Sequence, residues 1–171
     1  MKIIPTILAL ICLAGCAGYN TRIMGIDAKD FKGRNWKKIA VGIPASLIVH
    51  ELSHWLYAET HGGGHFDFGE FITVMEDYRN QSHNTQQNFH RAGFIGQCFV
   101  GSILTAIPKT RHSDFTLGFN SFTTINTYLY TANGGIDKAN SDIAQLDNGR
   151  HEGWIYTGIA GGLTYINLNK N

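Results

Sequence analysis

Residues 45–58 read ASLIVHELSHWLYA and contain the pattern H-E-x-x-H, formed by His50, Glu51 and His54. The apolar residues on both sides predict a helix, on which residues four apart share a face. Two imidazoles at that spacing can hold one Zn²⁺ through nitrogen ligands roughly 2.0–2.1 Å from the metal. Glu51 lies beside them, where its carboxylate could take a proton from a water at the open zinc position. The pattern therefore predicts a zinc-dependent hydrolytic site.

The N-terminal residues have the form of a secretory signal. Lys2 is followed by an apolar run over residues 3–13, and the ending Leu13-Ala14-Gly15-Cys16 resembles the bacterial lipobox. That resemblance implies removal of residues 1–15 and lipidation of Cys16, which would tether the mature chain to a membrane. An ordinary signal peptide or an N-terminal anchor is the alternative.

A lipobox signal predicts a location in the cell envelope, lipid-anchored and facing the periplasm or the exterior. Ala17 follows the lipidation site where enteric-type bacteria often have an Asp for retention in the inner membrane. The outer membrane is therefore favoured.

The rest of the chain is long enough for one domain with a sizeable core. We expect a tether over residues 16–35 and a single domain over residues 36–171. The chain has 14 Lys and Arg against 13 Asp and Glu, without a basic stripe, which argues against a nucleic-acid partner. Cys12 lies in the signal and Cys16 at the lipidation site, so we expect Cys98 to be a small buried apolar residue without a disulfide.

The fold class predicted from these patterns is mainly α. The motif helix belongs to a segment from Trp36 to about His61; Pro44 fits a first helical turn, and Gly62-Gly63-Gly64 end the helix. Imperfect alternation over residues 66–75 predicts a short strand or hairpin. Polar residues 76–91 are expected to form a surface loop or a solvated helix start. Three further helices are expected in the long uncharged segments, at residues 92–108, 115–135 and 153–169.

These uncharged segments raise the question of membrane spans. A spanning helix needs roughly 20 mainly apolar residues. Two of the segments are shorter, and the longest is rich in Thr and Asn. The flanking charges give no consistent positive-inside bias. We therefore expect the buried helices of a small lipid-tethered domain, with a compact intramembrane bundle as the alternative.

A catalytic zinc usually has three protein ligands and a water, so two histidines leave one ligand to find. Several residues are possible by position: His61, His65, Glu70, Glu76 and Glu152. A stronger candidate is an aspartate within residues 141–150.

The order of features over residues 45–150 resembles the site-2 protease family of zinc metallopeptidases. Members carry H-E-x-x-H on a helix, then a Gly-containing turn with a short β segment, a helix opening with Ala-Gly, and an Asp in a Leu-Asp-Gly motif. This chain has comparable features in the same order: His50–His54, Gly62–Gly64, residues 66–75, Ala92-Gly93 and Leu146-Asp147-Asn148-Gly149. The resemblance implies His50 and His54 as zinc ligands, Glu51 as general base and Asp147 as third ligand. Asp142 remains its competitor.

The motif, the lipobox and the resemblance together predict a compact helical zincin-like domain with a short β hairpin after the motif helix. The expected activity is zinc-dependent hydrolysis of peptide bonds in an envelope protein or peptide. A metal-binding lipoprotein without catalysis is one alternative, and it predicts a closed four-ligand site. An interaction lipoprotein with an accidental motif is another, and it predicts no metal at all.

Overall fold

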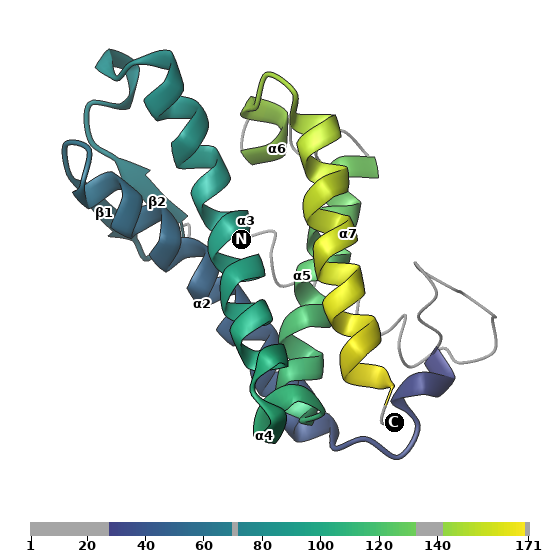
Figure 1. The fold of residues 1–171 in the computed structure, drawn as a ribbon. Helices are drawn as coiled ribbons and strands as arrows, with labels where there is room; N and C mark the ends of the chain where they lie inside the picture. Colours follow the sequence, from purple (N-terminus) through teal and green to yellow (C-terminus); the bar gives the residue numbers. More distant parts are fainter. Residues whose placement is uncertain (1–27, 70–71, 133–141, 170–171) are drawn as a thin grey trace. The chain divides into compact units, whose positions relative to one another are not determined.

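The computed structural model describes residues 28–69, 72–132 and 142–169 (Figure 1). The chain divides into two units, Met1–Arg34 and Asn35–Asn171. The described part of the first unit is the 3-10 helix η1 (Ala28–Phe31) and the residues after it. The predicted signal and Cys16 lie outside the described residues.

The second unit is mainly helical and has one short antiparallel hairpin, which confirms the predicted fold class at that level. Its elements in chain order are α2 (Trp36–Glu59), β1 (Gly64–Asp67), β2 (Ile72–Met75), η2 (Tyr78–Asn80), α3 (His83–Ala106), α4 (Pro108–Arg111), α5 (Asp114–Ala132), α6 (Asp142–Gln145) and α7 (Gly149–Leu168). β1 pairs with β2 in the register Gly64 to Met75 and Asp67 to Ile72.

The motif helix α2 begins at Trp36, where its segment was expected to open, so Pro44 does not lie in the first turn. The side chain of Asn35 accepts hydrogen bonds from the backbone N–H groups of Lys37 and Lys38, and this cap starts the helix at Trp36. Pro44 lies inside the helix with an exposed ring. The predicted end is confirmed, because Gly62 and Gly63 follow with φ of 125° and 103°.

Helix α3 begins at His83, within the polar stretch for which a surface loop or a solvated helix start was expected. Ser82 caps it through a hydrogen bond from the backbone N–H of Thr85, so the polar residues 83–91 form its first turns. This extension matters for the site, because it places His90 on the same helix as Gly93 and Gln97.

The four long helices alternate in direction along the chain (Figure 1). α5 packs against both α2 and α7, while α3 packs against α2, α5 and α7. Contacts along each pair of helices show these directions. The pairs α2–α3 and α5–α7 are antiparallel, with contacts His50–Gln97 and His54–Phe89 in the first and Asn120–Asn167 and Thr131–Gly153 in the second. The pairs α2–α5 and α3–α7 are parallel, with contacts Asn35–Asp114 and Ser46–Thr123 in the first and Arg91–Glu152 and Thr105–Asn167 in the second.

The hairpin is fixed to one end of this bundle by a small apolar cluster. Ala58 of α2, Met75 of β2 and Phe89 of α3 are buried together, with Tyr57 and Tyr78 packed against them. The cluster holds β2 beside the part of α2 that carries the H-E-x-x-H pattern.

Candidate metal centre

Three side chains converge between α2 and α6. The Nε2 atoms of His50 and His54 lie 3.1 Å apart. The Oδ2 atom of Asp142 lies 3.0 Å from Nε2 of His50 and 3.2 Å from Nε2 of His54. Both imidazoles are buried, with exposed fractions of 6% and 3%. Three potential ligand atoms therefore face one another in a largely enclosed place.

The spacing of these atoms suits one metal ion. Neighbouring ligands of a tetrahedral zinc at about 2.0–2.1 Å are roughly 3.3 Å apart. The three observed separations are close to that value, so little movement would bring the atoms into a coordination sphere. Two imidazole nitrogens and one carboxylate oxygen are also donors that zinc accepts.

Hydrogen bonds orient each imidazole so that Nε2 faces the centre. Nδ1 of His54 donates to the backbone carbonyl of Phe89 at 2.7 Å. Nδ1 of His50 lies 3.1 Å from Oε1 of Gln97 and donates to it. In a neutral imidazole with its proton on Nδ1, the lone pair is on Nε2, the atom that a metal needs.

Gln97 itself is held in one orientation by further buried contacts. Its Nε2 donates to the backbone carbonyl of Ser46 at 3.1 Å and to the Ser46 hydroxyl at 2.9 Å. The Ser46 hydroxyl also pairs with the hydroxyl of Thr123 on α5 at 2.8 Å. These contacts turn Oε1 of Gln97 towards His50, so α2, α3 and α5 all contribute to the position of that ring.

Asp142 opens α6 and is held as a carboxylate. Burial by itself raises its pKa. When the Nε2 atoms hold protons in place of a metal, the charge of His54 and hydrogen bonds with His50, His54 and His90 hold the pKa of Asp142 well below its usual range. His90 donates from Nδ1 to Oδ1 of Asp142 at 2.8 Å. The other carboxylate oxygen therefore remains directed at the two motif histidines.

Tyr78 continues this set of contacts on the hairpin side. Its hydroxyl lies 2.7 Å from Nε2 of His90. Burial and the charge of Asp142 raise the pKa of Tyr78, so the phenol stays protonated and donates to His90. His90 is thereby kept with its proton on the nitrogen that faces Asp142.

Glu51 is positioned by the hairpin. Its Oε2 atom accepts a hydrogen bond from the backbone N–H of Thr73 at 2.8 Å, and its backbone carbonyl accepts one from the Thr73 hydroxyl at 2.8 Å. The second carboxylate oxygen is not engaged by Thr73. β2 therefore fixes the orientation of the carboxylate that immediately follows the first histidine of the motif.

Gly93 allows α3 to approach the histidines. A Cβ atom at this position would collide with both imidazole rings, including 2.6 Å from Nε2 of His50. Any side chain at residue 93 would thus occupy the space between the α3 backbone and the two imidazoles.

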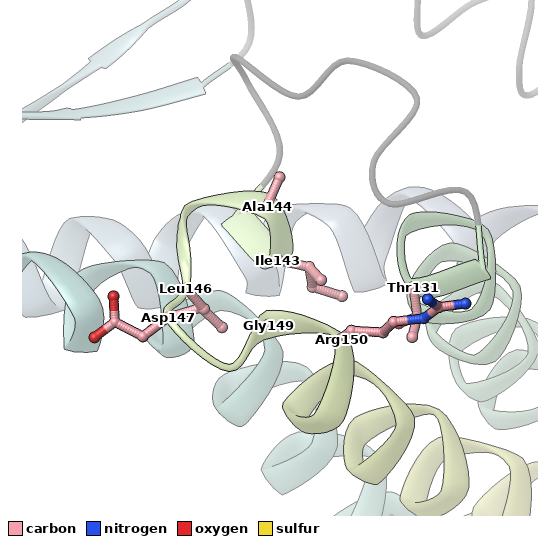
Figure 2. Close-up of a pocket in the computed structure, with 7 residues that line it drawn as sticks. All are labelled: Thr131, Ile143, Ala144, Leu146, Asp147, Gly149 and Arg150. Atoms are coloured by element: carbon pink, nitrogen blue, oxygen red, sulfur yellow. The ribbon is translucent and has the colours of Figure 1, made fainter.

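Asp147 is not brought into this cluster. Its carboxylate lies 2.6 Å from Nε2 of His83 in an exposed pair, with side-chain exposures of 61% and 64%. It also lines a pocket beside α6 and the start of α7, in which it and Arg150 extend in opposite directions (Figure 2). None of the three converging residues lines that pocket.

The remaining candidate ligands lie elsewhere. His61 stacks on Tyr57, and His65 lies 3.9 Å from Glu76 on the surface. Glu152 pairs with Arg91 at 2.7 Å. Glu70 lies outside the described residues.

Sequence reasoning missed the supporting residues Gln97, His90 and Thr73. A signal for two of them exists: His90, Gly93 and Gln97 recur at helical spacing and so share one face of α3. Thr73 has no such signal, because its role depends on where the hairpin packs.

Comparison of the chain with protein-family models, with curated proteins and with solved structures gives no match. The geometry of the site therefore carries the functional conclusion.

Proposed function

We propose that the chain is a zinc-dependent metallopeptidase with a zincin-like site. His50, His54 and Asp142 are its zinc ligands, and Glu51 is its general base. The observation that carries this proposal is that three potential ligand atoms, two from α2 and one from Asp142 of α6, lie 3.0–3.2 Å apart. Glu51 lies on α2 next to His50.

The number and kind of ligands favour a catalytic over a structural zinc site. Structural zinc sites have four protein ligands, often with cysteines, whereas catalytic sites have three and keep a position open. Among the described residues, only His50, His54 and Asp142 form a group with this spacing. The hydrogen bonds that the two rings donate to the Phe89 carbonyl and to Gln97 supply the outer support that zinc-binding histidines need.

Zinc at this site would supply Lewis-acid chemistry, polarising a scissile carbonyl and making a coordinated water more acidic. Glu51 follows His50 directly and would accept the proton of the attacking water. It would then return that proton to the leaving amine. Thr73 holds one carboxylate oxygen through its N–H and leaves the other for this transfer.

The substrate class follows from the same chemistry together with the sequence. A zinc site with an adjacent carboxylate base suits peptide-bond hydrolysis. The lipobox ending at Cys16 indicates the cell envelope, so we propose an envelope protein or peptide as substrate. The resemblance to site-2 proteases supports the same reaction, with Asp142 in place of Asp147 as third ligand.

The Glu51→Gln variant tests the proposal, with Glu59→Gln at the exposed end of α2 as its control. Glutamine keeps the shape of the side chain and an oxygen for the Thr73 N–H, but it cannot accept a proton. The full chain, purified in detergent, would be measured for bound zinc and for cleavage of a mixture of fluorescence-quenched peptides.

We expect Glu51→Gln to keep about one zinc per chain and to lose cleavage by about 10²–10⁴-fold. Glu59→Gln should behave as wild type in both measurements. Unchanged cleavage by Glu51→Gln would contradict the proposal. Zinc without any cleavage in the wild type would favour a non-catalytic metal-binding protein, and absence of metal would favour an interaction protein.

A further inference from the structure

The outward face of α2 is apolar between the charged residues at its two ends. Between Lys38 and Glu59, every exposed side chain is aliphatic, aromatic or proline: Ala40, Val41, Pro44, Ile48, Leu52, Trp55 and Leu56. The buried face of the same helix carries Ser46, His50 and His54. The helix therefore presents its apolar side to the surroundings and its polar side to its neighbours.

Helices α3 and α7 have the same arrangement. Between Asn88 and Lys109 the exposed residues are Ile95, Phe99, Ser102, Ile103, Ala106, Ile107 and Pro108. The hydroxyl of Ser102, the polar member of this set, donates to the carbonyl of Cys98 in its own helix. Between His151 and Asn169 the exposed residues are Trp154, Ile155, Gly158, Ile159, Gly162, Tyr165 and Ile166.

The interior of the bundle is polar in large part, beside buried apolar residues such as Phe94, Leu117 and Phe119. Its buried hydroxyl and amide residues on the long helices are Ser46, Gln87, Gln97, Thr105, Thr116, Asn120, Ser121, Thr123, Thr124, Thr127, Thr131, Thr157, Thr164 and Asn167. Several bond across helices, as Thr124 does with Thr164 at 3.0 Å and Asn120 with Asn167 at 2.7 Å. Others donate to a carbonyl one turn back in their own helix, as Thr131 does to Thr127. This is the reverse of the usual distribution in a water-soluble domain.

The helices also pack through small residues. A Cβ atom at Gly42 would collide with the backbone of α5, and one at Gly118 would collide with the backbone of Ile39 in α2. Such close backbone approach, with hydroxyls bonded between helices, is characteristic of helices that associate in lipid.

The dimensions match a bilayer. The uncharged outward face of α2 runs over residues 39–58, and twenty residues at 1.5 Å each span about 30 Å, the thickness of the hydrocarbon core. Charged residues lie at both ends of the bundle: Lys37, Lys38, Lys109, Arg111 and Asp114 at one end, and Glu59, Arg91, Arg150 and Glu152 at the other. Between these limits the four long helices carry one charged side chain, Glu51 of the candidate site.

Hydropathy alone gives a weaker indication. Within the described residues, α2 is the helix long and apolar enough to cross a membrane by length and composition, and 33% of its most apolar window is buried. In α5 and α7, threonines and asparagines such as Thr124, Thr164 and Asn167 lower the average, although these side chains are buried. The distribution of apolar and polar residues over the two faces of each helix is therefore a better indicator of a membrane span than the mean hydropathy.

We propose that α2, α3, α5 and α7 form a bundle embedded in a lipid bilayer, with acyl chains covering the outward faces of α2, α3 and α7. A second copy of the chain would cover one of these faces, whereas bilayer lipid covers all of them. The exposed apolar faces favour the intramembrane alternative over the lipid-tethered domain expected from the sequence. None of these observations involves the metal centre, so the bilayer proposal can be tested independently of the proposed function.

The native tryptophans provide the test. Trp55 and Trp154 are 40% and 43% exposed on the outward faces of α2 and α7. Full-length single-tryptophan variants, with phenylalanine at the other two positions, would be reconstituted in phosphatidylcholine vesicles. Emission would be compared between vesicles with and without bromine on the acyl chains, and with iodide added to the water. Circular dichroism would establish that each variant is folded.

We expect Trp55 and Trp154 to lose most of their emission in brominated vesicles and little with iodide. The control is His83→Trp in a background with all three native tryptophans replaced, because His83 lies at the polar start of α3; it should respond to iodide instead. Quenching of Trp55 and Trp154 by iodide but not by brominated lipid would overturn the proposal, because a tethered domain in water gives that result. A bundle that is quenched by lipid but binds no zinc would overturn only the proposed function.

Discussion

Gly93 lets the backbone of α3 lie against the imidazoles of His50 and His54. A methyl group there would collide with both imidazoles. We predict that Gly93→Ala weakens zinc binding by at least about tenfold, the lower end of the range for disturbed ligand support. Competition with a chromophoric chelator would measure the affinity.

The control for that substitution is Gly158→Ala on α7, where an added Cβ has no neighbour within 4 Å. It should leave the zinc affinity unchanged. If Gly93→Ala also binds zinc as tightly as the wild type, the centre does not lie where the two rings meet α3.

Gln97 supports His50 without belonging to the ligand set. In Gln97→Met, Nδ1 of His50 loses its acceptor and the ring is free to turn. We predict a loss in zinc affinity of about 10–100-fold, the usual range for such outer partners. Gln86→Met makes the same change on the first turns of α3, away from the rings, and should have little effect. Equal affinities for the two variants would contradict the role given to Gln97.

The motif residues could be predicted from the sequence because their spacing is local. His50 and His54 share a face of one helix whatever the rest of the chain does. The third ligand depends instead on tertiary packing across 88 residues between His54 and Asp142. Asp142 and Asp147 are five positions apart, yet the first meets the histidines and the second meets His83 on the surface. No local pattern separates them.

At the level of the helices, the crossing of α2 and α5 depends on glycine. The α-carbon of Gly118 packs against the backbone of Ile39, so a side chain at this position must push the helices apart. We predict that Gly118→Ala lowers the free energy of unfolding by about 1–3 kcal/mol, as overpacking commonly does. Thermal unfolding in detergent would measure it.

The matched control is Gly162→Ala in α7, where no atom lies within 4 Å of an added Cβ. It should be neutral or slightly stabilising. A Gly118→Ala protein as stable as Gly162→Ala would show that α2 and α5 are not in close backbone contact.

The helices themselves were predictable, but two of their starts were not. The apolar runs are long, and each gave a helix close to its predicted place. Pro44 could be taken for a first turn, and residues 76–91 could be loop or helix, because the caps Asn35 and Ser82 lie within polar stretches that resemble loops. The hairpin followed from its alternation, whereas its contact with Glu51 depends on packing that the alternation does not encode.

For the molecule as a whole, the proposed bilayer would place the side chain of Ile48 among the acyl chains of the hydrocarbon core. It lies midway along residues 39–58 and is 47% exposed. Lysine at the centre of a spanning helix costs about 2.5–3.5 kcal/mol on insertion scales. We predict that Ile48→Lys sharply reduces the amount of folded protein in the membrane, as measured by fractionation and immunoblotting.

Glu59→Lys at the end of the same helix is the control and should accumulate normally. A tethered domain in water would accept lysine at an exposed position with little effect. Normal accumulation of Ile48→Lys would therefore argue against the bilayer. The segment over residues 115–135 argued against a span because it is rich in threonine and asparagine, whereas in the structure most of these side chains are buried.

The central claim is that His50, His54 and Asp142 hold one zinc ion. Its most direct test is the metal content of the purified full chain, measured by elemental analysis for wild type, Asp142→Ala and Asp147→Ala. We expect about one zinc per chain in the wild type and in Asp147→Ala, and loss of zinc in Asp142→Ala. A folded wild type without stoichiometric metal, or zinc retained by Asp142→Ala and lost from Asp147→Ala, would contradict it.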